Sequence, residues 1–434
     1  MNRLFIADPS LKDIRGHHYM MTREATRSAH QMGFETIWLC SAAFSSTLDF
    51  ENARIAPVFS ASMYDAYIKQ KQVAEKPSLL ARLAHKLTGR PVPVALPPSN
   101  FYEDLKSALA QWEIGPQDRV LLHSADGESL SGVARLIHET PADALPVFHV
   151  ATPYDPVGIM PKRQSAEGFA ASLGELKASG KLYRKLFLYA ENAYLAEHLS
   201  TLWDAQVRPL PIAASPPPPG AADAARSTLT DKLGIPKDSL IIISLGSARL
   251  EKGFHKIPDI VEELFPRASQ FPGAKEKIKF VLHASPQIVG RDPKITEAID
   301  ALAARAEEVI LLLDPLSDED YQMLLHASDI VLLPYGEHEY RVRGSAVVTE
   351  ALAAGKTLVA AANTYPGKAA DAHGGLTASA PTDYADAILD IYKNRERYRE
   401  QALRESESFI AENRMETYWR RCLDAEREAE LSAT

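Results

Sequence analysis

Residues 330–361 read IVLLPYGEHEYRVRGSAVVTEALAAGKTLVAA and contain two apolar runs, separated by a polar turn and a longer, mostly apolar segment. The runs Ile330–Leu333 and Thr357–Ala361 have the length of buried strands. The segment between them is long enough for a helix and ends at Gly355, where a glycine can adopt the left-handed conformation that closes a helix. Strand, helix and strand in this order predict an α/β fold.

The same alternation continues on both sides of this stretch. A helix is predicted over His18–Met32, and another begins at Ser317, because Ser317 and Asp320 have the spacing of a capping box. We therefore predict two doubly wound, Rossmann-like domains that face a cleft. The other predicted strands are Leu4–Ala7, Thr36–Leu39, Arg119–His123, Val147–Val150, Leu186–Tyr189, Leu240–Leu245, Ile278–His283 and Val309–Leu313.

The length of the chain and one change in composition indicate where the domains divide. A chain of 434 residues is too long for one compact domain and long enough for two. The sequence AASPPPPGAADAARS at 213–227 interrupts the alternation, and its four consecutive prolines favour an extended spacer. The predicted divisions are an N-terminal domain over 1–212 with an insertion at 61–100, a Pro-rich linker over 213–228, a C-terminal domain over 229–400 and a charged C-terminal helix over 401–434.

The composition excludes several classes of protein. Hydrophobic residues make up 46% of the chain and charged residues 24%, which is ordinary globular composition and argues against wholesale disorder. The net charge of −9 argues against a nucleic-acid partner, because such proteins present a broad basic face. Cys40 and Cys422 lie at opposite ends of the chain and form neither a zinc site nor a disulfide framework. No segment is apolar for long enough to cross a bilayer, so we expect a cytoplasmic protein.

A turn with two cations follows the predicted strand Leu240–Leu245. It reads GSARLEKG at 246–253, and its small residues let the backbone approach a ligand closely. Arg249 and Lys252 near the start of a helix suit a phosphate or a diphosphate. The turn has neither the Walker spacing nor a GxGxxG fingerprint. A solvated strand-to-helix turn is the alternative interpretation.

A second polar cluster belongs to the helix of residues 330–361. Gly344 and Ser345 are predicted at the helix N-terminus, where free amide groups attract anions, and Arg341 and Arg343 add positive charge just before it. Glu350 follows in an otherwise apolar stretch, where a carboxylate needs hydrogen-bond donors. A ribose diol would supply two donors. The alternative is a glutamate on the polar face of an amphipathic helix.

These two clusters resemble the donor domain of the retaining GT-B glycosyltransferases, in particular family 4, the glycosyl transferases group 1. The resemblance extends from about Ser244 to Arg399, and the motifs agree in order and spacing. The matching stretches are GSARLEKGF at 246–254, LLDPLSDEDYQMLLHASDIVLLPY at 312–335, GSAVVTEALAAGKTLVAA at 344–361 and GGLTASAPTDYADAILDIYKNRERY at 374–398.

The resemblance implies roles for residues of both clusters. Lys252 would contact the donor diphosphate and, with Arg249, would stabilise the leaving group. Glu350 would bind the nucleotide ribose. The other residues that the resemblance places on the donor are Gly246, Ser247, Arg341, Arg343, Gly344 and Ser345.

Two positions depart from the family pattern. Val342 stands where the family has a glutamate that touches the sugar, and Ser247 stands where an arginine is common. Neighbouring arginines could take over these roles. Two alternatives to transfer therefore stay open, namely a non-catalytic GT-B-fold protein that binds a sugar nucleotide or acts as a scaffold, and a sugar-nucleotide epimerase.

The first half of the chain resembles the acceptor domain of the same enzymes. Gly16 follows the first strand, where the family has a glycine loop near the donor phosphates. His149 matches a family histidine that faces the sugar, and a purely structural histidine is the alternative. The last helix, with Tyr418 and Trp419, resembles the family helix that crosses back to the N-terminal domain.

The resemblance implies transfer of a sugar, of the hexosyl type, from a nucleotide-diphosphate sugar to a hydroxyl acceptor with retention of anomeric configuration. The acceptor would be a saccharide or lipid-linked saccharide in bacterial surface polysaccharide or glycolipid assembly. We expect no metal and no cofactor, because Asp318, Glu319 and Asp320 suit the first turn of a helix better than a metal site. A peripheral contact with the cytoplasmic membrane face is a further expectation, through the basic residues Lys177, Lys181, Arg184 and Lys185 and through the basic, partly amphipathic insertion at 61–100. A solvated helix face is the alternative for both stretches.

Overall fold

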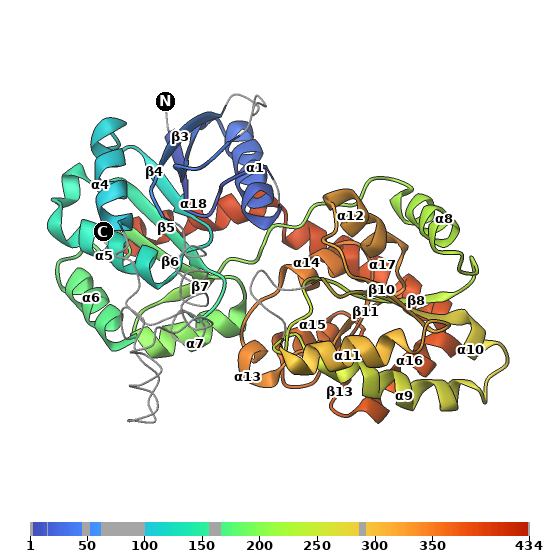
Figure 1. Cartoon of the computed structure of the whole chain (residues 1–434). Coiled ribbons are helices and arrows are strands. Elements are labelled where there is room, and N and C mark those ends of the chain that lie inside the picture. The colour runs from blue at the N-terminus through green and yellow to red at the C-terminus, as the bar shows by residue number, and fades with distance from the viewer. Residues whose placement is uncertain are drawn as a thin grey trace, which may run out of the picture. The chain divides into compact units, whose positions relative to one another are not determined.

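The chain consists of two compact units, each built around one parallel β-sheet (Figure 1). The computed structural model describes residues 3–14, 16–45, 53–61, 100–155, 166–285 and 292–432. Unit 1 comprises Met1–Pro211 with Met415–Thr434, and unit 2 comprises Ile212–Arg414. The α/β architecture with two doubly wound sheets is therefore confirmed. The insertion predicted at 61–100 lies outside the described residues except at its two ends.

Unit 1 has a seven-stranded sheet in the order β3-β2-β1-β4-β5-β6-β7. Its strands are β1 (Arg3–Asp8), β2 (Glu35–Ser41), β3 (Arg54–Phe59), β4 (Arg119–Leu122), β5 (Val147–Thr152), β6 (Leu186–Ala190) and β7 (Val207–Pro209). Its helices are α1 (Gly16–Gln31), α4 (Phe101–Gln111), α5 (Gly127–Glu139), the short η1 (Ala142–Ala144), α6 (Ala166–Ala178), α7 (Ala193–Trp203) and α18 (Met415–Ser432).

Unit 2 has a six-stranded sheet in the order β10-β9-β8-β11-β12-β13. Its strands are β8 (Leu240–Ser244), β9 (Ile278–His283), β10 (Val309–Leu312), β11 (Ile330–Leu333), β12 (Thr357–Ala361) and β13 (Leu376–Ala378). Its helices are α8 (Ala221–Leu233), η2 (Phe254–Lys256), α9 (Ile257–Ala268), α10 (Ala274–Lys277), α11 (Pro293–Ala303), α12 (Asp318–Ala327), α13 (Glu337–Tyr340), α14 (Ala346–Ala353), α15 (Tyr365–Ala372), α16 (Pro381–Lys393) and α17 (Arg395–Glu412).

The order of strands in unit 2 reverses between β8 and β11, which are neighbours in the sheet. Strands β9 and β10 follow on one side of β8, and β12 and β13 follow on the other side of β11. Ligands of doubly wound sheets bind at such a switch point, outside the carboxyl ends of the strands. The topology therefore predicts a ligand site at the turns after β8 and β11.

Every strand predicted from the sequence is present, with small differences at the ends. The predicted start of α12 is also confirmed, because the Ser317 hydroxyl accepts a hydrogen bond from the backbone amide of Asp320. Strands β3, β7 and β13 were not predicted. All three lie at the edges of the sheets, where less of a strand is buried and the apolar signal is weaker.

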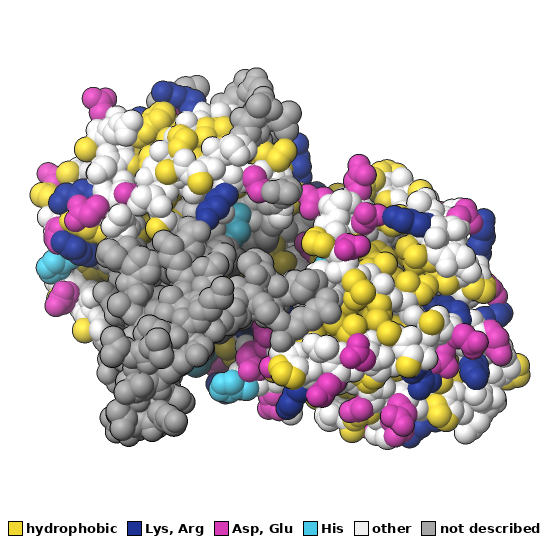
Figure 2. Space-filling model, viewed as in Figure 1, with side chains coloured by type: hydrophobic (Ala, Val, Ile, Leu, Met, Phe, Trp, Pro, Cys, Tyr) yellow, Lys and Arg dark blue, Asp and Glu magenta, His cyan; other side chains and the backbone are white. Residues whose placement is uncertain are grey.

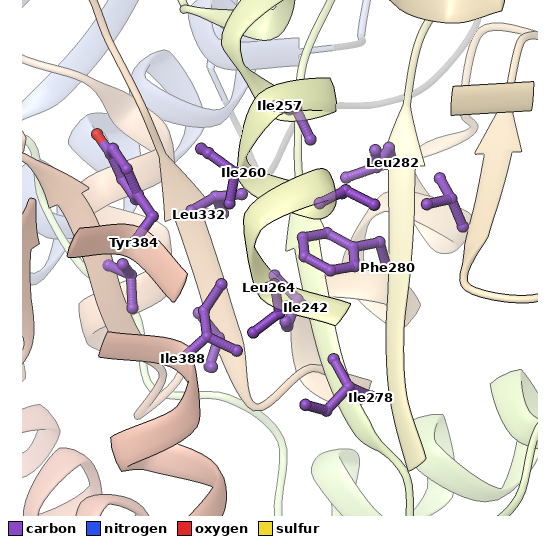
Figure 3. Close-up of a cluster of buried hydrophobic side chains, with 14 of the residues drawn as sticks. Ile242, Ile257, Ile260, Leu264, Ile278, Phe280, Leu282, Leu332, Tyr384 and Ile388 are labelled. Carbon is purple, nitrogen blue, oxygen red and sulfur yellow. The ribbon is translucent and has the colours of Figure 1, made fainter. Parts of the chain in front are cut away.

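Helices cover both faces of the sheet in unit 2, and each face has its own apolar core. The side chain of Ile242 points to one face of β8, while Ile241 and Ile243 point to the other. The first core lies under α9, α11 and α16 and is drawn in Figure 3, where Phe280 and Leu264 face each other between strand and helix. Burial on both faces explains why the strands read as continuous apolar runs.

The first division, after Pro211, agrees with the predicted end of the N-terminal domain at residue 212 to within one residue, whereas the linker and the C-terminal helix differ from the prediction. Helix α8 begins at Ala221, within the segment expected to be a linker at 213–228, and it packs against α12 as part of unit 2. The segment expected as one C-terminal helix at 401–434 contains the end of α17, which stays with unit 2, and α18, which belongs to unit 1. The prolines therefore disrupt only the residues before Ala221, since alanine-rich sequence after them favours a helix.

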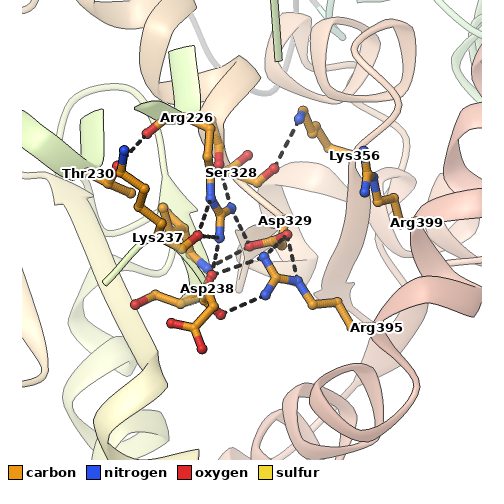
Figure 4. A network of polar contacts seen from close by, with 12 residues as sticks. Arg226, Thr230, Lys237, Asp238, Ser328, Asp329, Lys356, Arg395 and Arg399 are labelled. Carbon is orange, nitrogen blue, oxygen red and sulfur yellow. Dashed lines mark hydrogen bonds and ion pairs between the residues drawn. The ribbon is translucent and has the colours of Figure 1, made fainter. Parts of the chain in front are cut away.

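One carboxylate joins four segments at the amino ends of the strands in unit 2. Asp329 precedes β11 and pairs with Arg226 of α8 at 2.8 Å and with Arg395 of α17 at 2.8 Å (Figure 4). It also accepts a hydrogen bond of 2.8 Å from the backbone amide of Ile241 in β8. The two guanidinium groups donate in addition to carbonyl oxygens of the loop before β8, including that of Ser239. The network fixes α8 and α17 to the sheet.

We expect Asp329→Asn to lower the free energy of unfolding by about 3 kcal/mol, because two partly buried guanidinium groups lose their counter-charge. Urea unfolding followed by circular dichroism would measure the change. The matched control is Asp386→Asn, whose carboxylate pairs with Arg267 on the surface and should contribute less than about 1 kcal/mol. Equal effects of the two substitutions would contradict the role assigned to Asp329.

Candidate functional site

The turn after β8 and the segment after β11 are in direct backbone contact. Gly253 has a φ of +68°, and a Cβ added there would lie 1.8 Å from the carbonyl oxygen of Pro334. The amide of Gly336 donates a hydrogen bond of 2.9 Å to the carbonyl of Glu251. A side chain at Gly253 would therefore separate the two segments, so the glycine is required by the close approach as well as by its conformation.

Lys252 is held against the start of its own turn and against an aromatic ring. A Cβ added at Gly246, whose φ is +95°, would lie 2.4 Å from the Nζ atom of Lys252. The Nζ atom lies 5.8 Å from the centroid of the Tyr335 ring. The Tyr335 ring in turn packs against Tyr340 at 4.4 Å, and Arg343 lies over the Tyr340 ring at 5.0 Å. The two predicted clusters thus form one site at the switch point of unit 2.

The site has more positive than negative charge near Lys252. Desolvation, followed by the charges of Arg249 and Arg343, lowers the pKa of Lys252 to about 7. Arg249 pairs with Glu251 at 2.9 Å, but its Nε atom is buried and has no acceptor among the described residues. Two partly buried cations, one of which has an unused donor, favour an anionic ligand, which would supply acceptors and negative charge together.

Glu350 lies in α14, and its side chain contacts Tyr321 of α12. The Tyr321 hydroxyl donates a hydrogen bond to one carboxylate oxygen of Glu350. Burial raises the pKa of Glu350 above its usual value, and the Tyr321 hydrogen bond and the Lys252 charge offset part of this effect. Glu350 is therefore a partly desolvated carboxylate with acceptor capacity left for a ligand hydroxyl.

Tyr321 was not predicted as a site residue. Its position four residues after Ser317 marked it only as part of a helix. Nothing in the local sequence signals that α12 and α14 bring Tyr321 and Glu350 together, because strand β11 and helix α13 lie between the two residues in the chain.

The remaining predicted donor residues lie on the same two segments, with different accessibility. Ser345 is the N-cap residue of α14, and its side chain makes no capping hydrogen bond. Gly344 is buried beside it, whereas Arg341 is exposed and Ser247 is partly buried. The structure thus brings Arg249, Lys252, Arg343 and Glu350 into electrostatic contact and leaves Arg341 at the surface.

His149 has the structural role that was the alternative to a sugar contact. The residue lies in the middle of β5, and its side chain is 0% exposed. Its Nδ1 atom lies 3.0 Å from the Tyr189 hydroxyl, and its Nε2 atom lies 2.9 Å from a carboxylate oxygen of Glu426 in α18. The prediction of a sugar contact is therefore corrected: both nitrogens are used within unit 1, and strand β5 continues to Thr152 before the edge of the sheet is reached.

Gly16 is the first residue of α1 and has a φ of +70°, which a glycine adopts without strain. Close to it, at the carboxyl end of β1, Asp8 lies 2.8 Å from His18 and 3.3 Å from His123. Burial lowers the pKa of His123 to about 4. For His18, burial is offset by the charge of Asp8 together with its hydrogen bond, which raise the pKa. This titratable cluster in unit 1 was not predicted.

The three acids that the sequence places in the first turn of a helix are found there. Asp318, Glu319 and Asp320 form the first turn of α12, and Asp320 also pairs with Lys232 at 3.0 Å. Within the described ranges, no group of three or more histidine, cysteine, aspartate or glutamate side chains is arranged to hold a metal ion.

The lowered pKa of Lys252 predicts a pH-dependent stability. Between pH 7 and 10.5 the unfolded chain binds a proton that folded Lys252 largely loses, so wild-type stability should rise with pH in this window. Lys252→Met removes this dependence, and we expect the variant to be the more stable protein at pH 7, with a difference that shrinks toward pH 10. Urea unfolding at several pH values measures it, with the exposed Lys237→Met as control. A difference that stays constant with pH would rule out the desolvated lysine.

Comparisons with known proteins bear on this site. Residues 259–394 match the family model described as Glycosyl transferases group 1. No curated protein sequence matches the chain. Among solved structures, a glycosyltransferase from Rickettsia africae is 13% identical with a TM-score of 0.64, and 98% of each chain is covered.

Two further structures have the same fold over essentially the whole chain. A sucrose-phosphate synthase from Thermosynechococcus elongatus is 14% identical, with a TM-score of 0.62 and 100% of both chains covered. A UDP-forming trehalose-phosphate synthase from Burkholderia xenovorans is 14% identical, with a TM-score of 0.65 and 99% of both chains covered. The resemblance stated from the sequence is thus confirmed: residues 259–394 are similar to the glycosyl transferases group 1, and the chain as a whole has the fold of the GT-B glycosyltransferases.

Proposed function

We propose that the protein is a retaining glycosyltransferase that moves a sugar from a nucleoside-diphosphate donor to a hydroxyl acceptor. The observation that carries the proposal is the pairing of a desolvated cationic cluster at Arg249 and Lys252 with the partly desolvated carboxylate of Glu350. The cations suit a diphosphate, and the carboxylate suits a ribose diol. Both lie at the switch point of a doubly wound sheet, which supports nucleotide binding.

The chemistry assigned to the site is charge stabilisation of a leaving group. The bond between the anomeric carbon and the diphosphate oxygen breaks, the acceptor oxygen bonds to the same face of the sugar, and the acceptor proton passes to the departing phosphate. Arg249 and Lys252 neutralise the charge that grows on the diphosphate, and the nearby charge of Arg343 adds to this effect. The proposal gives this role to side chains and requires neither a metal nor a cofactor besides the nucleotide sugar.

For the acceptor, the proposal names only a chemical class, the sugar phosphates. The similar structures include a trehalose-phosphate synthase in complex with glucose-6-phosphate and a sucrose-phosphate synthase, which supports sugar phosphates as the first acceptors to test. A saccharide or lipid-linked saccharide of bacterial surface polysaccharide assembly is the alternative acceptor.

The proposed setting is the cytoplasm. Acidic and basic side chains are interspersed over the visible described surface in Figure 2, which supports a partner other than nucleic acid. No helix of the described residues is both long and apolar enough to span a membrane. Two of the four basic residues expected at a peripheral contact have structural bonds, because Lys181 donates to the carbonyls of Ile137, His138 and Thr140, and Lys185 donates to that of Leu145. These bonds weaken the case for membrane contact through these two lysines, while most of the insertion at 61–100 lies outside the described residues.

Nucleotide binding tests the donor site. A nucleoside diphosphate at 100 times its dissociation constant should stabilise the wild type by about 2.7 kcal/mol, which raises the melting temperature measurably. In a thermal-shift screen of UDP, GDP, ADP and their sugars, we expect one base to shift the wild type and Glu350→Ala to lose most of that shift. The exposed Glu400→Ala is the matched control and should behave as wild type. The absence of a shift with every nucleotide would overturn the proposed donor.

Turnover distinguishes transfer from binding alone. We expect Lys252→Ala to reduce turnover at least tenfold with an unchanged fold, because one preorganised contact to leaving-group charge is lost. Product formation from the identified nucleotide sugar and a sugar-phosphate acceptor is measured by chromatography, and the anomeric configuration by NMR, with Lys237→Ala as control. Donor binding without product would favour the scaffold alternative, and an epimerised donor without acceptor would favour the epimerase.

A further inference from the structure

The last residue of β9 is a buried histidine without a hydrogen bond. His283 is 8% exposed, and neither ring nitrogen has a partner within the part of the chain that the structure describes. The backbone of Asp314 lies close enough to affect the pKa of His283 but does not complete a hydrogen bond. Buried polar groups are nearly always satisfied, and one that is not destabilises the folded protein. This histidine therefore calls for a functional explanation.

His283 lies beside the turn that carries Arg249 and Lys252. Strand β9 pairs with β8 up to its carboxyl end, where Leu282 is opposite Ser244. The amide of Ala248 in the turn after β8 approaches the carbonyl of Ser285 at 3.4 Å, which links the segment after His283 to this turn. Burial lowers the pKa of His283, and the charge of Lys252 lowers it further, so the two side chains interact electrostatically.

Two buried nitrogen donors lack acceptors among the described residues at the carboxyl ends of β8 and β9. They are the Nε atom of Arg249 and the N–H group of the His283 imidazole. Lys252 lies in the same turn as Arg249, and its charge acts on His283. An anion with several oxygens would supply acceptors to these side chains and would offset the charges of Arg249 and Arg343 that act on Lys252, which a neutral ligand would not do.

We propose that His283 is a further binding residue of the donor site, whose imidazole N–H donates a hydrogen bond to a phosphoryl oxygen of the nucleoside diphosphate, next to Arg249 and Lys252. The inference rests on the proposed function and adds to it a contact from β9, on the side of β8 opposite to β11. The role of the buried imidazole would then be to bind the ligand, and it would not stabilise the unliganded fold.

The proposal predicts opposite effects of one substitution on stability and on binding. His283→Leu removes an unsatisfied buried polar group, so the unliganded variant should melt at or above the wild-type temperature. The same variant should bind the nucleoside diphosphate identified by the thermal-shift screen at least tenfold more weakly, since a hydrogen bond to a charged group is lost. His283→Gln retains an amide donor and should recover part of the affinity, and it remains informative if His283→Leu does not fold.

Isothermal titration with the nucleoside diphosphate and with inorganic pyrophosphate separates the outcomes. The control is His373→Gln, because His373 lies in the same unit and pairs with Glu405 instead. A loss of affinity for both probes supports the phosphoryl contact. Loss for the nucleotide alone would overturn it in favour of a contact to the nucleoside. Unchanged affinity in folded His283 variants would overturn this inference alone, whereas a wild type that binds neither probe would overturn the proposed function as well.

Discussion

The contact between the backbone of Gly253 and the carbonyl of Pro334 is the constraint on which the site of unit 2 depends. No side chain fits between these two groups, so the turn after β8 and the segment after β11 meet directly. The parallel sheet makes this contact available, because β8 and β11 are neighbours and their carboxyl ends lie at one edge. Once the segments meet, Lys252 is enclosed next to Tyr335 and its charge is desolvated.

Charged side chains have different surroundings at the two ends of the strands in unit 2. At the amino ends, Asp329 is neutralised by Arg226 and Arg395 and by a backbone amide, so the network is satisfied and fastens helices to strands. At the carboxyl ends, the charges of Arg249 and Arg343 act on Lys252 more strongly than those of Glu251 and Glu350. Neither nitrogen of the His283 imidazole has a hydrogen-bond partner among the described residues. The Asp329 network stabilises the fold. The desolvated lysine and the unsatisfied histidine destabilise it, and the packing of the rest of unit 2 compensates for this cost.

Unit 1 illustrates how one residue type can serve different purposes. His149 is a core residue that connects β5 to α18 through Glu426, and Arg119 reaches the same carboxylate at 2.8 Å. His18 and His123, by contrast, share Asp8 at the edge where the strands end. His149 lies within β5, His123 directly follows β4, and His18 lies in the first turn of α1. The place of each histidine in its element, and the elements packed over it, distinguish structural pairing from a titratable cluster.

The sequence by itself determined the elements and much of the site. Apolar runs, the Ser317 cap and the glycines of the turns depend on residues a few positions apart, and for this reason the strands and the start of α12 were predictable. Arg249 and Lys252 in one turn and Glu350 in a helix were singled out as two separate clusters, and the structure joins them into one site. Only the tertiary structure decided that Tyr321 reaches Glu350, that His283 lies beside the Lys252 turn and that His149 is enclosed. These contacts depend on which strands are adjacent and on what is excluded from water, and neither property is encoded within a local stretch of sequence.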